Sequence, residues 1–165
     1  MKRQIQQVLD VLEKLGISYE MHEHPPLPTI EEAMEYWGDI EAVHCKNIFF
    51  RNHKGNRHYL VILKHTAKLD IHDLEKRLKQ GKLSFASVKR LQRYLCIEPG
   101  SVSPYGLIND TENHVYVFFD ENLLTAKRIS FHPNVNTASV VVDFSDFIRY
   151  MDWTGNSYEF TRLYD

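Results

Sequence analysis

The sequence predicts an α/β (α+β) fold in which a mixed, largely antiparallel sheet is flanked by helices. Two observations lead to this prediction. Segments with a helical repeat of apolar residues are interspersed with short β-prone runs along the whole chain. The chain has 165 residues, of which 43% are hydrophobic, enough for one well-formed core but short for two. Residues 1–165 are therefore expected to form a single domain.

The N-terminal part of the chain predicts two helices separated by a strand. Apolar residues recur at helical spacing over 2–15, and Gly16 follows them in the position of a C-cap. A strand is expected over 17–22. After a proline-rich break, Thr29 stands three residues before a glutamate, the spacing of a capping box, which predicts a second helix toward Trp37.

The remainder of the chain predicts strands with three further helices. Two apolar runs, 47–51 and 58–63, are separated by a glycine-containing turn, which is typical of a β-hairpin. Helices are expected to begin near Asp70 and after Ser87, the second ending near Leu95. The last segments predicted are strands at 115–119, 127–132 and 139–144 and a closing helix at 145–151.

The charge balance argues against a protein that grips duplex nucleic acid through a global positive field. The chain carries 20 Lys and Arg against 22 Asp and Glu, a formal net charge of −2. Basic residues do gather between Lys64 and Arg93, where a solvated helical face and a local RNA contact both remain open. DNA is therefore not an expected partner, and any contact with RNA must be local.

The cysteine and hydropathy patterns favour a cytoplasmic location. Cys45 and Cys96 are the two cysteines, and they form neither a C-x-x-C pair nor a series typical of a disulfide framework. No apolar stretch approaches the roughly 20 residues that cross a bilayer. The expectation is a reducing compartment without membrane contact.

Familiar catalytic and cofactor motifs are absent from the sequence. It contains no Gly-x-Ser-x-Gly elbow, no P-loop and no dinucleotide-binding fingerprint. Its nine histidines lack the spacings of a helical metal site, although His22 and His24 could chelate weakly from one strand face. Neither a cofactor nor a metal is predicted, and serine hydrolase, NTPase and Rossmann functions lose support.

The segment 100–110 has the composition of a shaped loop. It places Gly100, Pro104 and Gly106 between apolar runs. Glycine reaches backbone angles closed to other residues, and proline fixes φ and has no N–H, so the loop can turn bare amides toward an oxyanion or a phosphate. An ordinary turn is the competing interpretation.

Two side chains outside this loop could also act on a substrate. Lys46 directly precedes an apolar strand, where its cation could face a pocket, although a surface lysine is the commoner case. His132 precedes a polar turn and can donate, accept or titrate near neutrality. A hydrogen-bonded loop histidine is the commoner case for that residue.

Four segments, taken together, resemble the YbaK/prolyl-tRNA synthetase-associated editing family in its order and spacing. They are His44-Cys-Lys-Asn-Ile-Phe-Phe-Arg51, Lys82-Leu-Ser-Phe-Ala-Ser87, Glu98-Pro-Gly-Ser-Val-Ser-Pro-Tyr-Gly-Leu-Ile-Asn-Asp110 and Phe131-His-Pro-Asn-Val-Asn-Thr-Ala-Ser139. The resemblance covers nearly the whole chain and is strongest to the free-standing prolyl-tRNA editing proteins, which deacylate alanyl-tRNA(Pro). It implies a compact mixed-sheet domain in the cytoplasm that hydrolyses an aminoacyl ester on a mischarged tRNA.

Matching positions in the family imply roles for individual residues. Lys46, Gly100 and Pro104 correspond to the family's pocket lysine and Gly-x-x-x-Pro loop and are the expected catalytic residues. Cys45 stands where the family usually has a threonine-like residue, and Val135 lies inside the histidine loop, so the amino-acid preference stays open. The expected substrate-binding residues are His132, Asn47, Asn136, Ser103, Ile48 and Leu107.

The residue inventory suits ester hydrolysis without a protein nucleophile. An activated ester needs an oriented water and stabilisation of the developing oxyanion. With no obvious carboxylate pair or triad, a route assisted by the ribose hydroxyl of the tRNA's terminal adenosine is favoured, and the resemblance implies the same route.

The expected partner is the acceptor end of mischarged tRNA(Pro), with prolyl-tRNA synthetase or an elongation factor as further candidates. A deacylase for a cysteinyl or seryl ester is one alternative function. A non-catalytic module that binds aminoacyl-tRNA or an amino acid is the other. A scaffold role finds no supporting feature in the sequence.

Overall fold

The structure is a computed structural model that describes residues 2–26 and 40–165. The helix predicted to begin at Thr29 lies outside these residues. The elements in chain order are α1 (Lys2–Lys14), β1 (Tyr19–Glu23), β2 (Val43–Asn52), β3 (His58–Lys64), α3 (Ile71–Leu78), β4 (Leu83–Phe85), α4 (Val88–Leu95), the 3₁₀ helix η1 (Pro104–Asn109), β5 (Val115–Asp120), the 3₁₀ helix η2 (Glu121–Thr125), β6 (Arg128–Phe131), β7 (Ala138–Asp143), α5 (Phe144–Thr154) and β8 (Tyr158–Thr161).

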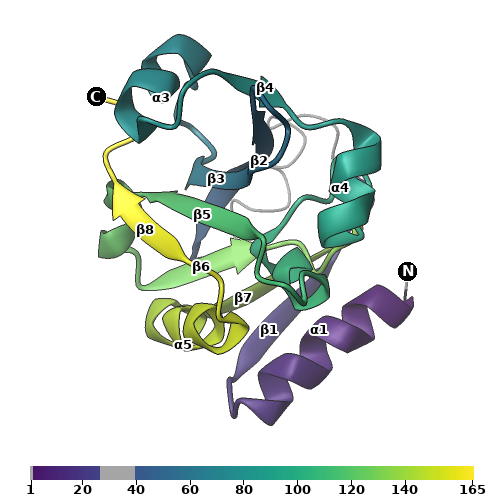
Figure 1. Ribbon diagram of the computed structural model, residues 1–165. Helices are drawn as coiled ribbons and strands as arrows, with labels where there is room; N and C mark the ends of the chain where they lie inside the picture. Colours follow the sequence, from purple (N-terminus) through teal and green to yellow (C-terminus); the bar gives the residue numbers. More distant parts are fainter. Residues whose placement is uncertain (1, 27–39) are drawn as a thin grey trace.

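The eight strands form one mixed sheet in the order β1-β7-β6-β2-β3-β5-β8, with β4 paired to β2 (Figure 1). The pairs β1–β7, β6–β7, β2–β3 and β2–β4 are antiparallel. The pairs β2–β6, β3–β5 and β5–β8 are parallel. The prediction of a mixed, largely antiparallel sheet with flanking helices is therefore confirmed.

The helices and strands predicted for the described residues are present close to their expected bounds. The predicted caps act as such, since the Asp70 side chain accepts from two amides of α3 and the Ser87 side chain accepts from Arg90 N in α4. The elements β4, β8, η1 and η2 were not predicted. Both missed strands are short and owe their conformation to pairing with β2 and β5, which are distant in sequence.

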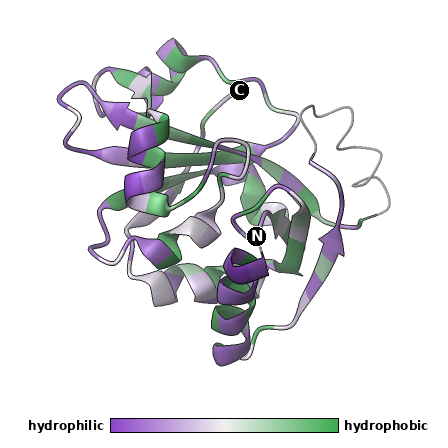
Figure 2. Cartoon of the chain, turned by 90° about the vertical axis from the view of Figure 1, so that its right-hand side faces the viewer, coloured by the Kyte–Doolittle hydropathy of each residue, from purple (hydrophilic) through white to green (hydrophobic). Residues whose placement is uncertain are grey.

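The sheet has a packed layer on each face. In β3, Leu60 and Ile62 point into a large core shared with α1, α4 and α5, whereas Val61 and Leu63 point into a smaller core under α3. Figure 2 shows apolar colouring concentrated in the central strands and hydrophilic colouring on the surrounding turns. All of β3 from His58 to Leu63 is buried, as expected for a central strand.

Strand β2 has two different neighbours along one of its edges. Val43 and His44 pair with β6, whereas 50–52 pair with β4. Between these pairings, residues 45–48 have no strand beside them on this edge within the described part of the chain. The sheet therefore opens at the segment that carries the predicted site residues Lys46 and Asn47.

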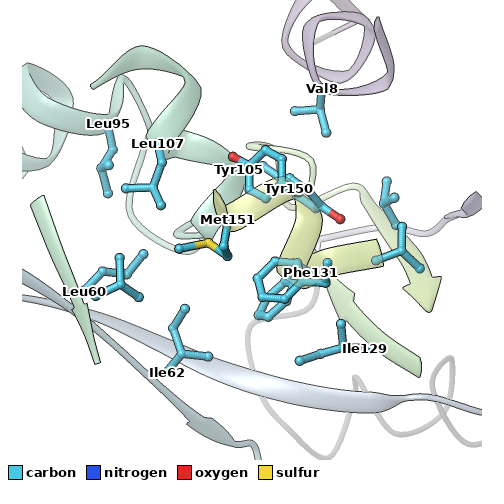
Figure 3. Packing of buried hydrophobic residues seen from close by; sticks show 14 of the residues in the cluster. Val8, Leu60, Ile62, Leu95, Tyr105, Leu107, Ile129, Phe131, Tyr150 and Met151 are labelled. Atoms are coloured by element: carbon cyan, nitrogen blue, oxygen red, sulfur yellow. The ribbon is translucent and has the colours of Figure 1, made fainter. Parts of the chain in front are cut away.

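Two buried tyrosines support the start of η1. Tyr105 of η1 and Tyr150 of α5 pack edge to face, with ring centroids 5.1 Å apart (Figure 3). Tyr150 Oη donates to the carbonyl oxygen of Pro104 at 2.8 Å. Among the described residues, the buried hydroxyl of Tyr105 finds no hydrogen-bond partner. Both rings are therefore buried, but only the hydroxyl of Tyr150 makes a hydrogen bond to a described residue.

The buried His58 has its protonation state set by its neighbours. Its Nε2 lies 3.0 Å from Arg90 Nη1 and its Nδ1 lies 2.8 Å from His114 Nε2. Because arginine can only donate, we assign Nε2 as the acceptor and place the proton on Nδ1, which donates to His114. Burial, together with the charges of nearby basic groups, lowers the pKa of His58 to about 4.

The tyrosine pair gives a matched stability prediction. Tyr150→Phe leaves the carbonyl of Pro104 without its buried donor, so we expect the free energy of unfolding to fall by about 1–2 kcal/mol. Tyr105→Phe removes a hydroxyl that has no partner among the described residues and should leave stability unchanged or raise it. Urea denaturation of both variants checks this. An equal loss in the two would contradict the assignment.

The state of His58 predicts loss of stability in mild acid. Its pKa is lower in the folded chain than the ordinary value of 6.5, so the unfolded chain binds more protons between these two pKa values. This contribution is complete above about pH 6.5 and is lost as the pH falls toward 4.

Between pH 7.5 and pH 5 the expected loss from this one group is about 2 kcal/mol. Urea denaturation at the two pH values measures it. His58→Gln should flatten the pH dependence, whereas His53→Gln at the exposed hairpin tip should not. A slope unchanged by His58→Gln would refute the prediction.

Candidate functional site

The loop at 100–103 leads into η1 through an unusual backbone. Gly100 has φ +87°, in the left-handed region that favours glycine. Ser101 N donates to Glu98 O at 3.1 Å, and Ser103 Oγ caps η1 by accepting from Tyr105 N at 3.1 Å. No hydrogen bond is found between the amides of Gly100, Val102 or Ser103 and the other described residues. That these amides face a ligand stays a prediction.

The end of the loop packs against the core at Gly106. The side chains at Leu95 and Ile97 press against Gly106 so closely that a Cβ there would overlap Ile97 and lie 3.1 Å from Leu95 Cβ. Pro104 is buried at the start of η1 and accepts from Tyr150. The position of the loop is thus set by α4 and α5 together.

The turn after β6 meets this loop. Asn134, at φ +63°, donates through Nδ2 to the Tyr105 carbonyl at 3.2 Å. A Cβ built on Gly100 would lie 3.9 Å from Asn136 Nδ2, so the two segments are neighbours. His132 Nδ1 donates to the Ala138 carbonyl at 2.8 Å, which leaves Nε2 as the acceptor of the neutral ring.

Histidines near the turn are held in the neutral form. Burial lowers the pKa of His132, and the bond to Ala138 opposes only part of this effect. His24 packs nearby, with ring centroids 5.9 Å apart, and hydrogen-bonds Ser139 Oγ. Burial, followed by the charge of His65, lowers the pKa of His44 to about 4. At neutral pH, His132 and His44 therefore present polar but uncharged rings.

Asn47 and His132 share a small cavity of about 20 Å³. A space of this size holds one water-sized group. Asn47 Oδ1 is buried there and has no hydrogen-bond partner among the described residues. The residues that line the cavity are His44, Cys45, Asn47, Ser130, Phe131, His132 and Ser139. Burial raises the pKa of the Cys45 thiol, which therefore stays protonated and serves as a small packing residue.

Lys46 points away from this cavity. Neighbouring residues of a strand face opposite sides, so Lys46 lies on the face of Ile48 and the smaller core, whereas Asn47 lies on the face of the large core. The ammonium of Lys46 donates to the carbonyl of Ala67, in the turn that follows β3. The predicted catalytic lysine and the His132 turn thus flank the open edge of β2 from its two sides.

Three other residues that were predicted to bind substrate pack within the protein. Ser103 is fully buried and its hydroxyl caps η1. Leu107 is 3% exposed and lies in the large core near Leu95 (Figure 3). Ile48 packs against the smaller core. These positions support the site from within, so the expected substrate contacts of Ser103 and Leu107 would need a rearranged loop.

Two residues that sequence reasoning missed join the site. Asn134 links the two loops, and Tyr150 holds the Pro104 carbonyl from α5. Asparagine after proline is a signal for a turn with positive φ and could have indicated Asn134. The role of Tyr150 depends on a contact between residues 46 positions apart, for which the sequence has no local signal.

Metal ligation and membrane insertion find no support in the described ranges. Among residues 2–26 and 40–165, no group of three His, Cys, Asp or Glu side chains is placed to hold a metal ion. No helix within these same residues is long and apolar enough to cross a bilayer.

Comparison with known proteins shows the family of the chain. The aminoacyl-tRNA editing domain family matches residues 24–150. The prolyl-tRNA editing protein ProX of Acetoanaerobium sticklandii is 41% identical over 160 residues, 96% of each chain. The prolyl-tRNA synthetase associated domain-containing protein 1 of Danio rerio is 31% identical over 147 residues, covering 88% of this chain and 79% of the relative.

A solved structure described as a proposed trans-editing enzyme for prolyl tRNA synthetase has the same fold, with a TM-score of 0.71 and 19% identity over 96% of each chain. The family match spans most of the chain, including β2, the Gly100 loop and the His132 turn. The chain belongs to the aminoacyl-tRNA editing domain family.

Proposed function

We propose that this protein is a trans-editing deacylase that hydrolyses the ester of mischarged alanyl-tRNA(Pro). The observation that carries the proposal is the 41% identity, over 96% of both chains, with a prolyl-tRNA editing protein. The geometry adds support, because His132 shares a cavity with Asn47 at the open edge of β2, and the Gly100 loop is a neighbour of the His132 turn. The residues named below are proposed for their roles on this basis.

The Gly100 loop would stabilise the charge that develops on the ester carbonyl oxygen. The amides of Gly100 and Val102 are the candidate donors, since no hydrogen bond is found between them and other described residues. A single donor of this kind typically contributes about 3 kcal/mol to the transition state. Pro104 would hold the loop in place through its bond with Tyr150.

The reaction transfers no group to the protein. The oxygen of a water attacks the ester carbonyl carbon, the bond from that carbon to the ribose oxygen breaks, and the proton lost by the water ends on the ribose oxygen. The neighbouring ribose hydroxyl would orient the water, since the described residues of the site include no carboxylate pair. Neutral His132 can accept through Nε2 from the ammonium group of the aminoacyl substrate.

Lys46 would hold the terminal adenosine from the other side of β2. Its ammonium now donates to the neutral carbonyl of Ala67. A phosphate would compete for it, since its negative charge attracts the ammonium more strongly than a neutral carbonyl does. This role places the nucleotide on the Lys46 face and the amino acid on the Asn47 face.

Selection of alanine over proline would be steric. The cavity beside Asn47 and His132 has a volume of about 20 Å³, room for a group of the size of a methyl or a water but not for the ring of proline. Ser130, Ser139 and Asn47 give the cavity a polar lining, which favours a seryl ester as the second candidate substrate. A cysteinyl ester differs from it by a single atom.

The partner in this proposal is the acceptor end of tRNA(Pro), in the cytoplasm. Prolyl-tRNA synthetase or an elongation factor would bring the mischarged tRNA to this site. A non-catalytic binding module would show the same tRNA contacts without turnover.

The proposal is tested by single-turnover deacylation with enzyme in excess. We expect rapid loss of labelled alanine from alanyl-tRNA(Pro), while prolyl-tRNA(Pro) is spared, with seryl- and cysteinyl-tRNA measuring the alternatives. Lys46→Ala should slow the reaction at least tenfold, whereas Lys64→Ala, at the partner of Cys45 in β3, should not. No hydrolysis of any ester would refute the deacylase and favour the binding module.

The oxyanion role of the loop can be tested by comparing two glycines with similar backbone angles. Gly100 and Gly16 both have positive φ, +87° and +70°, and neither has a neighbour closer than 3.9 Å to an added Cβ. Alanine at either position should therefore lower the free energy of unfolding by a similar amount, about 1–2 kcal/mol. Only Gly100→Ala should also lower the deacylation rate, by tenfold or more. Equal activity in the two folded variants would remove the loop from the mechanism.

A further inference from the structure

An aromatic side chain is exposed beside the open edge of β2. Phe85, at the end of β4, is 65% exposed. One side of its ring stacks on the buried Phe50, with centroids 5.2 Å apart and planes inclined by 26°. The ring is therefore held flat against the protein while much of its surface remains open. Rigid, exposed aromatic rings of this kind are the usual platforms for unpaired bases.

Phe85 lies on the same face of the sheet as Lys46. Phe50 and Phe85 are paired residues of antiparallel strands, so their side chains share one face. Lys46, Ile48 and Phe50 are every second residue of β2, so they also lie on that face. Phe50 follows Lys46 by four positions, about 13 Å along β2. A strand of RNA with its terminal nucleotide at Lys46 would reach Phe85 with an earlier nucleotide.

A basic groove continues beyond Phe85, between the β2–β3 turn and the α3–β4 turn. It has a volume of about 420 Å³. The groove carries four permanent cations, Lys54, Arg57, Lys79 and Lys82, and none of the described residues that line it is acidic. On a chain with a net charge of −2, this concentration of positive charge is local.

Both walls of the groove are held by hydrogen bonds. The Asn52 side chain accepts from Asn56 N and Arg57 N, each at 3.1 Å, and fixes the β2–β3 turn. Tyr59 Oη donates to Gln80 Oε1 at 3.2 Å, linking β3 to the turn after α3. The cations therefore project from two rigid turns and line a surface of fixed shape.

Strand β4 connects the groove with the aromatic ring. Lys82 directly precedes this strand and Phe85 ends it, about 10 Å apart. Lys46, Phe85 and the groove thus follow one another along β2. The surface therefore offers, in order, the cation of Lys46 at the proposed reacting end, the Phe85 ring on which a base could stack, and the groove cations that could bind phosphates.

We propose that this surface binds the single-stranded 3′ end and adjoining stem of the substrate RNA, with Phe85 stacking on an unpaired base and the groove holding backbone phosphates. The inference rests on the proposed function for the identity of that RNA as a tRNA. The ring favours unpaired bases over a continuous duplex, and the cations favour a polyanion over a neutral peptide.

The stacking role is tested with a labelled RNA hairpin that ends in a single-stranded CCA, beside the same hairpin with a blunt end. Fluorescence anisotropy should show that Phe85→Ala weakens binding of the CCA hairpin about tenfold and leaves the blunt hairpin unchanged. Phe85→Leu, which still covers Phe50, should behave like Phe85→Ala, and Phe85→Tyr should bind like the wild type. Leu124→Ala, at another exposed apolar side chain, is the control.

The groove is tested by salt titration with both hairpins. Lys54→Ala and Lys79→Asn remove one cation from each wall, and asparagine tolerates the left-handed backbone of residue 79. Each should weaken both hairpins and lower the slope of log affinity against log salt by nearly one per lost phosphate contact. Lys14→Ala on α1 should change neither quantity. Unchanged slopes for the groove variants, or unchanged CCA binding in Phe85→Ala and Phe85→Leu, would overturn the proposal.

These measurements use RNA without an amino acid, so they separate this inference from the reaction. If the wild type binds the CCA hairpin through Phe85 but hydrolyses no ester, the surface stands and the deacylase fails. If the wild type hydrolyses alanyl-tRNA(Pro) but binding ignores Phe85 and the groove, the deacylase stands and the surface fails.

Discussion

The divided pairing of β2 is the constraint on which the site depends. The strand carries β6 beside its first residues and β4 beside its last, and residues 45–48 lie between them. On the other edge, β3 pairs with the strand throughout this stretch and holds its backbone in place. Within the described residues the result is a strand that is paired on one edge, from which Lys46 and Asn47 project to opposite sides.

The His132 turn and the neighbouring Gly100 loop are positioned by long-range contacts. Asn134 joins the His132 turn to the Tyr105 carbonyl, and Tyr150 joins α5 to the Pro104 carbonyl. These bonds use carbonyl groups, whereas the amides of Gly100 and Val102 make no hydrogen bond to other described residues. Donors fixed before a substrate arrives need little rearrangement when charge develops, which is the physical basis of an oxyanion site.

Local signals predicted the elements well and the site in part. The helix caps at Asp70 and Ser87 and the left-handed backbone of Gly100 follow from residue type alone. The placement of Ser103 and Leu107 does not, because the motif shows that they belong to the loop but not which side chains turn inward. Tyr150 and Phe85 gain their roles from neighbours distant in sequence, which no pattern within one segment reveals.

The close packing at Gly106 bears on how the specificity of this site could change. Because the glycine lies against Leu95 and Ile97, any side chain at 106 would displace the loop from its support on α4. The amide-bearing half of the site is thus tied to the core and tolerates little variation. The turn from His132 to Asn136 is joined to it by the side chain of Asn134, and no further hydrogen bond between the two is found in the described part of the chain. If the proposed function holds, a change of amino-acid preference should therefore arise in that turn, while the Gly100 loop stays constant.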